Sequence, residues 1–202
     1  LNNSKKPFII YKSDKGFDLY TDFSKKIILN NKNIKKFINK NTRLKSTSKE
    51  TDLFIGFFGY EILNNLIDVK IKKKQTTNFP KGIFYKPETK VKLSNNLEYK
   101  KTKSLSPSDL FKININKKSY KVIFDKFKKK IKSGETYQIK ICTKYSNKSQ
   151  IDALDFFSRL VKTNMAPEAF MIKDKNYSII SCSPENLITK KNNFITTKPI
   201  AG

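Results

Sequence analysis

The sequence contains no histidine and no tryptophan, only two cysteines, and only two arginines, Arg43 and Arg159. Without histidine, these 202 residues cannot form a Ser-His or Cys-His catalytic pair. Cys142 and Cys182 show no zinc-binding spacing and fit a reducing compartment. The longest apolar run, residues 53–60 (LFIGFFGY), is far short of the ~20 residues that cross a bilayer. We therefore expect a cytoplasmic protein with no membrane partner.

Lysine dominates the charge. Lys and Arg number 43 against 17 Asp and Glu, which gives a formal net charge of +26. Such a balance is typical of nucleic acid-binding proteins, so a basic nucleic acid-binding protein is one interpretation. Arginine, however, is the residue that forks onto guanine edges and phosphates, and it is nearly absent. We therefore expect no nucleic acid partner, while the charge would attract small anionic substrates to a cleft.

Hydrophobic patterns predict both strands and helices. Helical spacing of apolar residues predicts helices over residues 34–38, 61–69, 119–134 and 151–161, with Ser119 as an N-cap and Gly134 as a helix stop. We predict that residues 53–60 form a buried segment and that residues 101–109 form a linker. This mixture predicts an α+β fold. Short apolar or alternating runs predict strands over residues 7–11, 17–23, 27–29, 83–85, 137–145, 169–173, 177–181, 187–189 and 194–197.

The end of the sequence combines a carboxylate with a predicted hairpin. Two apolar pairs, residues 187–188 and 194–195, flank a polar Lys-Lys-Asn-Asn turn. Glu185 stands before the hairpin among apolar neighbours, and a Pro-Ile-Ala-Gly turn at residues 199–202 closes it. Apolar surroundings disfavour the charged form of a carboxyl group, which lets it act as a general acid, although an exposed turn glutamate is the plainer alternative. We expect further residues to follow Gly202.

A glutamine occupies the polar side of the predicted strand 137–145. Gln138 can donate and accept hydrogen bonds, but it cannot act as a base at neutral pH. It is a candidate for positioning a substrate, with a sheet-surface glutamine as the alternative.

Five segments, in this order, resemble the chorismate-utilising enzymes, specifically component I of anthranilate synthase and of aminodeoxychorismate synthase. Five ordered motifs are far more specific than any short pattern. The resemblance is strong from about residue 120 onward and weak before residue 53. The segments are FIGFFGYE (54–61), KSGETYQIKICTKYS (132–146), APEAFM (166–171), SCSPENLI (181–188) and TTKPIAG (196–202).

The resemblance implies a layered antiparallel β-sandwich with flanking helices, here incomplete. It matches residues 1–110 with an N-terminal segment like that of anthranilate synthase component I. Residues 111–202 match the first part of the chorismate-binding region. The expected Mg²⁺ ligands belong to the missing C-terminal part, so no metal ligand is expected here and we expect the 202 residues alone to be inactive.

The resemblance also implies residue roles. Glu185 would protonate the departing C4 hydroxyl of chorismate, and Gln138 would position substrate or ammonia. Thr197, Ala201 and Gly202 would line the substrate site. A glutamine amidotransferase subunit would supply ammonia, and elimination of pyruvate would aromatise the ring.

Two positions separate the members of this family. Isochorismate and salicylate synthases carry a water-activating lysine where this chain has Gln138, so ammonia is the expected nucleophile. Aminodeoxychorismate synthases commonly have a nucleophilic lysine where this chain has Ala201. Ala201 therefore favours amination at C2 to anthranilate, the tryptophan pathway, while the TYQIK and APEAF segments favour the aminodeoxychorismate branch of folate synthesis.

In feedback-inhibited anthranilate synthases, a segment that resembles LLES is followed later in the sequence by a segment that resembles PSPYM. The corresponding effector-binding candidates here are Ser13, Pro167 and Phe170. The segment PEAFM departs from the family pattern, which weakens the expectation of inhibition by tryptophan.

Overall fold

The computed structural model describes residues 6–13, 15–41, 50–67, 79–94, 111–148, 151–191 and 193–200. The chain forms two compact units: Leu1–Lys100 with Ala153–Gly202, and Lys101–Asp152. The predicted linker 101–109 lies outside the described residues. The boundary at residue 110 concerns resemblance to family segments and stays a prediction.

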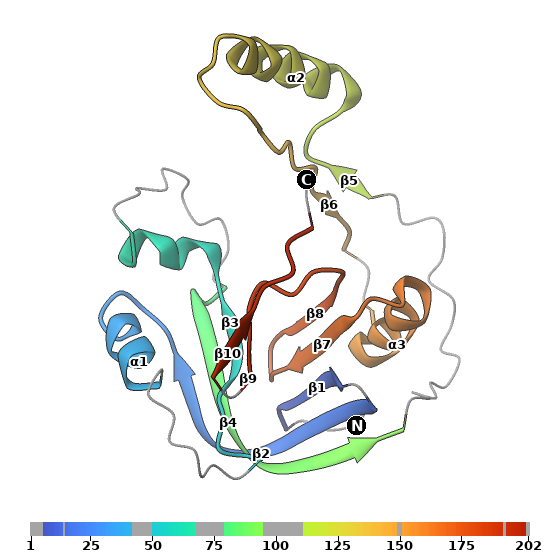
Figure 1. Ribbon diagram of the computed structural model, residues 1–202. Helices are drawn as coiled ribbons and strands as arrows, with labels where there is room; N and C mark the ends of the chain where they lie inside the picture. Colours follow the sequence, from blue (N-terminus) through green and yellow to red (C-terminus); the bar gives the residue numbers. More distant parts are fainter. Residues whose placement is uncertain are drawn as a thin grey trace. The chain divides into compact units, whose positions relative to one another are not determined.

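A six-stranded antiparallel sheet forms the first unit, in the order β3-β4-β2-β1-β7-β8 (Figure 1). Its long strands are bent, so the sheet curls (Figure 1). The predicted α+β class is confirmed. In the described part of the chain, helices lie against this sheet, and the second large sheet of the predicted sandwich is not formed. The strands are β1 (Phe8–Ser13), β2 (Gly16–Ile28), β3 (Ile55–Phe58), β4 (Gly82–Leu93), β7 (Glu168–Lys173) and β8 (Ser178–Ser183).

Strand β2 runs without interruption through the region where two strands were predicted. The prediction of separate strands at 17–23 and 27–29 is therefore wrong. Its pairing with β4 shifts between Phe23 and Lys25, and Asp22 adopts a left-handed φ of 52°. A bulge of this kind absorbs one extra residue and bends the strand without ending it.

The apolar segment at residues 53–60 forms an edge strand. Its residues in β3 are half-buried or exposed, so its predicted burial is wrong. Gly56 is required here, because a Cβ atom at this position would lie 1.9 Å from the carbonyl oxygen of Ile83 in β4. The following residues, predicted as a helix over 61–69, form the 3-10 helix η1 (Tyr60–Asn65).

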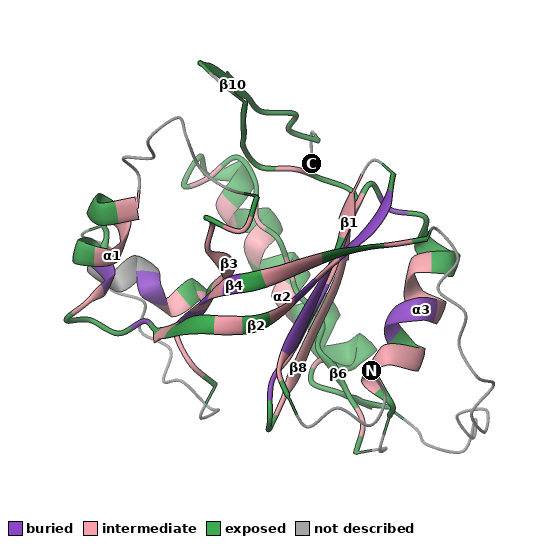
Figure 2. Cartoon of the chain, turned by 90° about the horizontal axis from the view of Figure 1, so that it is seen from below, coloured by how far each residue is buried: buried purple, intermediate pink, exposed green. Residues whose placement is uncertain are grey.

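Both faces of the central strand β1 are buried, which explains its uninterrupted apolar run. On one face, Phe8 and Ile10 pack with Phe157 of α3 (Ala153–Asn164). On the other face, Ile9 packs with Tyr85 and neighbouring aromatic residues. Figure 2 shows buried residues on β1 and α3.

A third, smaller core lies under α1 (Ile34–Asn41), the helix predicted from the spacing of its apolar residues. Ile34 is buried there with Leu29 and Ile62. This cluster attaches α1 and η1 to the end of β2.

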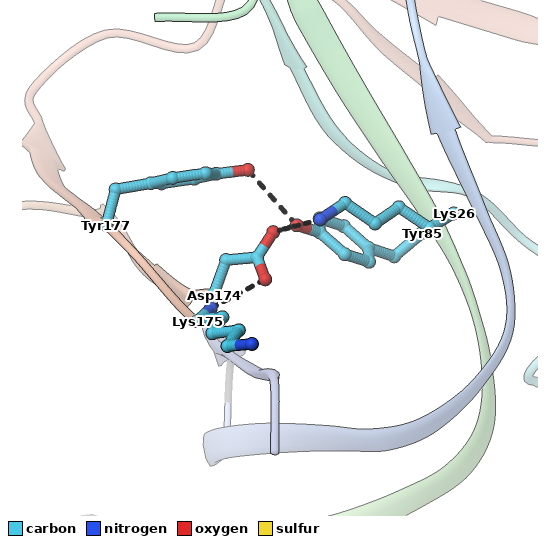
Figure 3. A network of polar contacts seen from close by, with 5 residues as sticks. All are labelled: Lys26, Tyr85, Asp174, Lys175 and Tyr177. Atoms are coloured by element: carbon cyan, nitrogen blue, oxygen red, sulfur yellow. Dashed lines mark hydrogen bonds and ion pairs between the residues drawn. The ribbon is translucent and has the colours of Figure 1, made fainter. Parts of the chain in front are cut away.

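A network of polar contacts lies next to the core cluster that contains Tyr85 (Figure 3). The Asp174 carboxylate accepts hydrogen bonds from Lys26 Nζ and Tyr85 Oη, each at 2.5 Å. Burial alone would raise the pKa of Asp174, but these hydrogen bonds outweigh it and lower the pKa to about 2. Tyr177 Oη lies 3.2 Å from Tyr85 Oη, and burial raises the pKa of both phenols.

The second unit contains α2 (Lys117–Lys132) and the short pair β5 (Lys112–Ile113) and β6 (Tyr145–Ser146). The N-cap is Asn116, whose side chain accepts a hydrogen bond from Ser119 N. Ser119 was predicted to be the N-cap and instead lies in the first turn. The predicted stop is confirmed: Gly134 follows the helix at a φ of 76°.

The predicted strand 137–145 is largely wrong. Only Tyr145 and Ser146 pair, with β5, while residues 137–144 have no regular structure. Alternating side chains give strand propensity, but a strand also needs a hydrogen-bonded neighbour. In the part of the chain that the structure describes, no helix is long and apolar enough to cross a membrane.

Candidate functional site at the β9–β10 hairpin

The predicted hairpin is present. Strands β9 (Thr189–Lys191) and β10 (Phe194–Thr196) pair in antiparallel register, with Thr189 opposite Thr196. β9 begins two residues later than predicted, because Leu187 and Ile188 precede the ladder. All residues of both strands are exposed, as Figure 2 shows for β10.

The Glu185 side chain joins the two ends of this hairpin. Its Oε1 accepts a hydrogen bond of 2.9 Å from the backbone N–H of Ile200. The Glu185 backbone is held in turn by Ser183: the hydroxyl donates to Glu185 O at 2.9 Å and accepts from Glu185 N at 3.3 Å. Glu185 is exposed, so the apolar surroundings predicted for it are absent from the described residues.

A second carboxylate lies one strand away. Glu168, the first residue of β7, accepts hydrogen bonds from Tyr11 Oη at 2.5 Å and from Asn186 Nδ2 at 2.9 Å. Thr189 Oγ1 then donates to Asn186 Oδ1 at 3.1 Å. A continuous polar chain thus connects β1 and β7 with the residue that follows Glu185.

A cavity of about 680 Å³ lies beside these groups. Its walls come from β1, the start of β7, the segment around Glu185 and the hairpin strands. The lining includes two lysines, three residues with hydroxyl groups and one amide beside a single carboxylate, a polar mixture suited to a small polar anion. The lining residues are Tyr11, Pro167, Glu168, Pro184, Asn186, Ile188, Thr189, Lys190, Thr196, Lys198 and Ile200.

The other residues predicted for the substrate site are only partly placed. Thr197 Oγ1 donates a hydrogen bond of 2.8 Å to Leu187 O, which fastens the end of the hairpin to its start. Ala201 and Gly202 lie outside the described residues. Gln138 is exposed in the second unit, and its role beside Glu185 stays a prediction.

The effector-binding candidates lie on neighbouring strands. Ser13 ends β1, and Pro167 immediately precedes β7, which pairs with β1. Phe170 lies opposite Tyr11 in that pairing. The structure thus brings the two effector segments together, while their binding role stays a prediction.

A second cavity, of about 510 Å³, lies on the side of the β2 bulge and contains none of the motif residues. Its walls include Lys26 and Tyr85 of the polar network, together with Asp22 and Glu88. Among the described residues, no three His, Cys, Asp or Glu side chains converge in a way that could hold a metal ion.

Sequence reasoning missed three polar partners in the site: Glu168, Asn186 and Tyr11. Glu168 and Asn186 stand inside the recognised segments APEAFM and SCSPENLI. The available signal was a charged residue, Glu168, directly before the predicted strand 169–173. The pairing of β1 with β7 could not be predicted from the sequence, because these strands lie more than 150 residues apart.

Comparison with known proteins gives the family of this chain. The family model described as chorismate binding enzyme matches residues 3–202. The chain therefore belongs to the chorismate-binding enzyme family, as the five ordered segments indicated. Membership of this family favours the enzyme interpretation over the nucleic acid-binding alternative.

The relatives include both branches considered above. The chain is 31% identical to anthranilate synthase component 1 of Buchnera aphidicola subsp. Pemphigus spyrothecae over 120 residues, covering 57% of this chain and 22% of that protein. It is 30% identical to aminodeoxychorismate synthase component 1 of Bacillus subtilis over 78 residues, covering 39% and 17%. Anthranilate synthase component 1 of Saccharolobus solfataricus is 24% identical over 160 residues, covering 73% and 38%.

The chain thus spans well under half the length of each of these relatives. Similar identities to the two branches leave the particular member of the family open.

Proposed function

We propose that the full-length protein aminates chorismate at C2 with ammonia and eliminates pyruvate to give anthranilate. The observation that carries this proposal is the Glu185 carboxyl group, which accepts a hydrogen bond from the Ile200 amide, directly before Ala201 and Gly202 in the sequence. This contact fixes one acid group next to the residues that the family resemblance assigns to the substrate ring. Fixed geometry of this kind is what general acid catalysis requires.

In the proposed reaction, ammonia forms the C2–N bond while both ring double bonds shift and the C4–O bond breaks, and the added nitrogen then releases one proton. Glu185 gives its proton to the departing C4 hydroxyl, which leaves as water. Loss of the C2 proton and cleavage of the C3–O bond then release pyruvate and aromatise the ring. Gln138 positions substrate or ammonia, and Thr197, Ala201 and Gly202 line the ring site. The short side chains at 201 and 202 allow the ring to approach the backbone.

Aminodeoxychorismate synthesis is the second candidate. It is supported by the 30% identity to the Bacillus subtilis aminodeoxychorismate synthase component 1. Ala201 favours the anthranilate route, because an alanine cannot attack chorismate as a lysine at that position would. Both routes share the proton donor role of Glu185.

Two further components belong to the proposal. A glutamine amidotransferase subunit would deliver ammonia, and Mg²⁺ would help to hold chorismate. The described residues do not offer a group of three acidic side chains for the metal, so we derive no step through it. We expect its ligands outside the described part of the chain.

The test is product identification with the full-length protein, chorismate, ammonium and Mg²⁺. Fluorescent anthranilate together with an equal amount of pyruvate is the expected result. Accumulation of aminodeoxychorismate without pyruvate would select the second candidate. No consumption of chorismate, together with tight binding of nucleic acid, would overturn the proposal.

A further inference from the structure

Two residues at one end of the β7–β8 ladder hold the segment that carries Glu185. Glu168 and Ser183 lie directly opposite each other, as the last pair of this ladder. Ser183 binds the Glu185 backbone, and Glu168 binds the side chain of the next residue, Asn186. The segment after β8 is therefore attached at two successive residues to a single cross-strand pair.

The attachment through Glu168 reaches the central strand of the sheet, β1, beside the buried core. Its second carboxylate oxygen accepts the Tyr11 hydroxyl at 2.5 Å, and Tyr11 belongs to the central strand β1. The neighbouring residues Ile10 and Ala169 are fully buried in the first core cluster. Lys12 Nζ adds a hydrogen bond of 2.5 Å to Ala166 O, which ties β1 to the loop before β7. Glu168 is therefore held in place by its position in β7 and by its hydrogen bond with β1.

Asn186 carries this constraint into the hairpin. Its Nδ2 donates to Glu168 while its Oδ1 accepts from Thr189, the first residue of β9. The amide is therefore fixed on both sides, and its orientation is defined. Glu185, one residue earlier, is exposed, and its side chain accepts a hydrogen bond from the backbone N–H of Ile200.

We propose that Glu168 is a positioning residue for the reaction, which acts through Asn186 to set the direction of the Glu185 carboxyl group. This inference rests on the proposed function of Glu185 as proton donor. A proton donor displaced by about 1 Å loses much of its effect, because proton transfer depends steeply on geometry. Glu168 makes no contact with substrate in this role and transfers no proton.

Four full-length variants test this role: Glu168→Ala, Asn186→Asp, the double variant Glu168→Gln/Asn186→Asp, and Glu88→Ala as control. Glu88 is an exposed glutamate of β4 and does not line the cavity beside the hairpin. The measurements are kcat and KM for chorismate with ammonium as nitrogen donor, and the thermal midpoint of each variant.

Glu168→Ala is expected to lower kcat about tenfold while KM for chorismate changes less than about twofold. Asn186→Asp places two carboxylates at hydrogen-bond distance and should lower kcat further. In the double variant, the glutamine amide donates to the new aspartate, so the hydrogen bond returns with reversed polarity. Its kcat should recover to within about threefold of wild type. Glu88→Ala should match wild type.

Recovery of kcat in the double variant, at unchanged thermal midpoint, distinguishes positioning from a general loss of stability. The inference is overturned if Glu168→Ala keeps wild-type kcat, or if the double variant remains as slow as Asn186→Asp. Glu185→Gln is measured in parallel. If it loses turnover while Glu168→Ala does not, the positioning role fails and the proposed function stands; if Glu185→Gln keeps turnover, the proton donor role itself fails.

Discussion

Helices α2 and α3 were predicted from the same kind of sequence pattern, yet they differ in what they bury. The apolar stripe of α3 packs against β7 and β8, and Phe157 is 0% exposed. The apolar residues of α2 have a similar period, but none of its residues is buried in this chain. Phe124 of α2 is 45% exposed.

The difference teaches that periodicity predicts a helix and the direction of its apolar face, but not what covers that face. The chain after α3 forms β7 and β8 and folds back onto the apolar stripe of α3, so adjacent strands cover this stripe. α2 holds together through local contacts instead: an N-cap at Asn116, a Gly134 stop and the pair Lys121–Asp125. Four pairs of variants sharpen this comparison.

The largest effect is expected at the core of α3. Phe157→Ala should lower the free energy of unfolding of this chain by about 3–5 kcal/mol, because it leaves a cavity between α3 and β1. The matched change Phe124→Ala in α2 should cost less than about 0.5 kcal/mol. Urea denaturation of both variants measures the two values. Equal losses would mean that α2 has a buried partner within this chain.

The next effect compares two glycines. Gly56→Ala should cost roughly 1–3 kcal/mol, since its new methyl group would collide with the Ile83 carbonyl in β4. Gly134→Ala, after α2, meets no atom within 4 Å and should cost about 1 kcal/mol, from the left-handed φ alone. Thermal denaturation ranks them. A neutral Gly56→Ala would contradict the close approach of β3 and β4.

The third pair of variants concerns the Asp174 network. Its lowered pKa means that the charged carboxylate stabilises the fold at pH values above the ordinary aspartate pKa. This contribution is lost as the pH falls from about 4 towards about 2. Asp174→Asn should therefore cost about 1–2 kcal/mol at pH 7 and flatten the acid dependence of stability in that range.

The exposed pair in α2 is the control for this variant. Asp125→Asn removes a surface ion pair and should change stability by less than about 0.5 kcal/mol. Denaturant titrations at successive pH values give both curves. If Asp174→Asn and Asp125→Asn show the same pH dependence, the network at β7–β8 does not stabilise the folded state.

The smallest effect separates the observed N-cap of α2 from the predicted one. Asn116→Ala should cost about 1 kcal/mol, because the hydrogen bond to Ser119 N is lost. Ser119→Ala should cost only a few tenths of a kcal/mol, since only its backbone takes part. Circular dichroism during urea titration measures both. If Ser119→Ala lowers stability more than Asn116→Ala does, Ser119 is the N-cap after all.

Much of the first unit was predictable from local patterns. Local sequence patterns, either a periodic spacing of apolar residues or a turn, predict three of its elements. These are the short strand at residues 8–13, the helix that contains Phe157 and the hairpin at residues 189–196. Strand β2 was split in the prediction because its bulge looks like a turn, and residues 137–144 were assigned a strand because alternation does not reveal whether a neighbour exists.

The site was predictable only where it follows a motif. Glu185 and the hairpin could be read from adjacent residues, including the relation between the two ends that the Glu185–Ile200 contact now shows. The Tyr11–Glu168–Asn186 chain could not be read, because it depends on β1 pairing with β7 from opposite ends of the sequence. Long-range pairing of this kind is set by the packed core rather than by local propensity.

The central claim is that the Glu185 carboxyl group supplies the proton for departure of the chorismate C4 hydroxyl. The most direct measurement is calorimetric chorismate binding and turnover by full-length Glu185→Gln, since glutamine keeps the size of the side chain and its hydrogen-bond acceptor for Ile200 N. The account predicts binding within about threefold of wild type and a fall in turnover of at least about a hundredfold. Turnover close to wild type, with chorismate bound equally well, would contradict it.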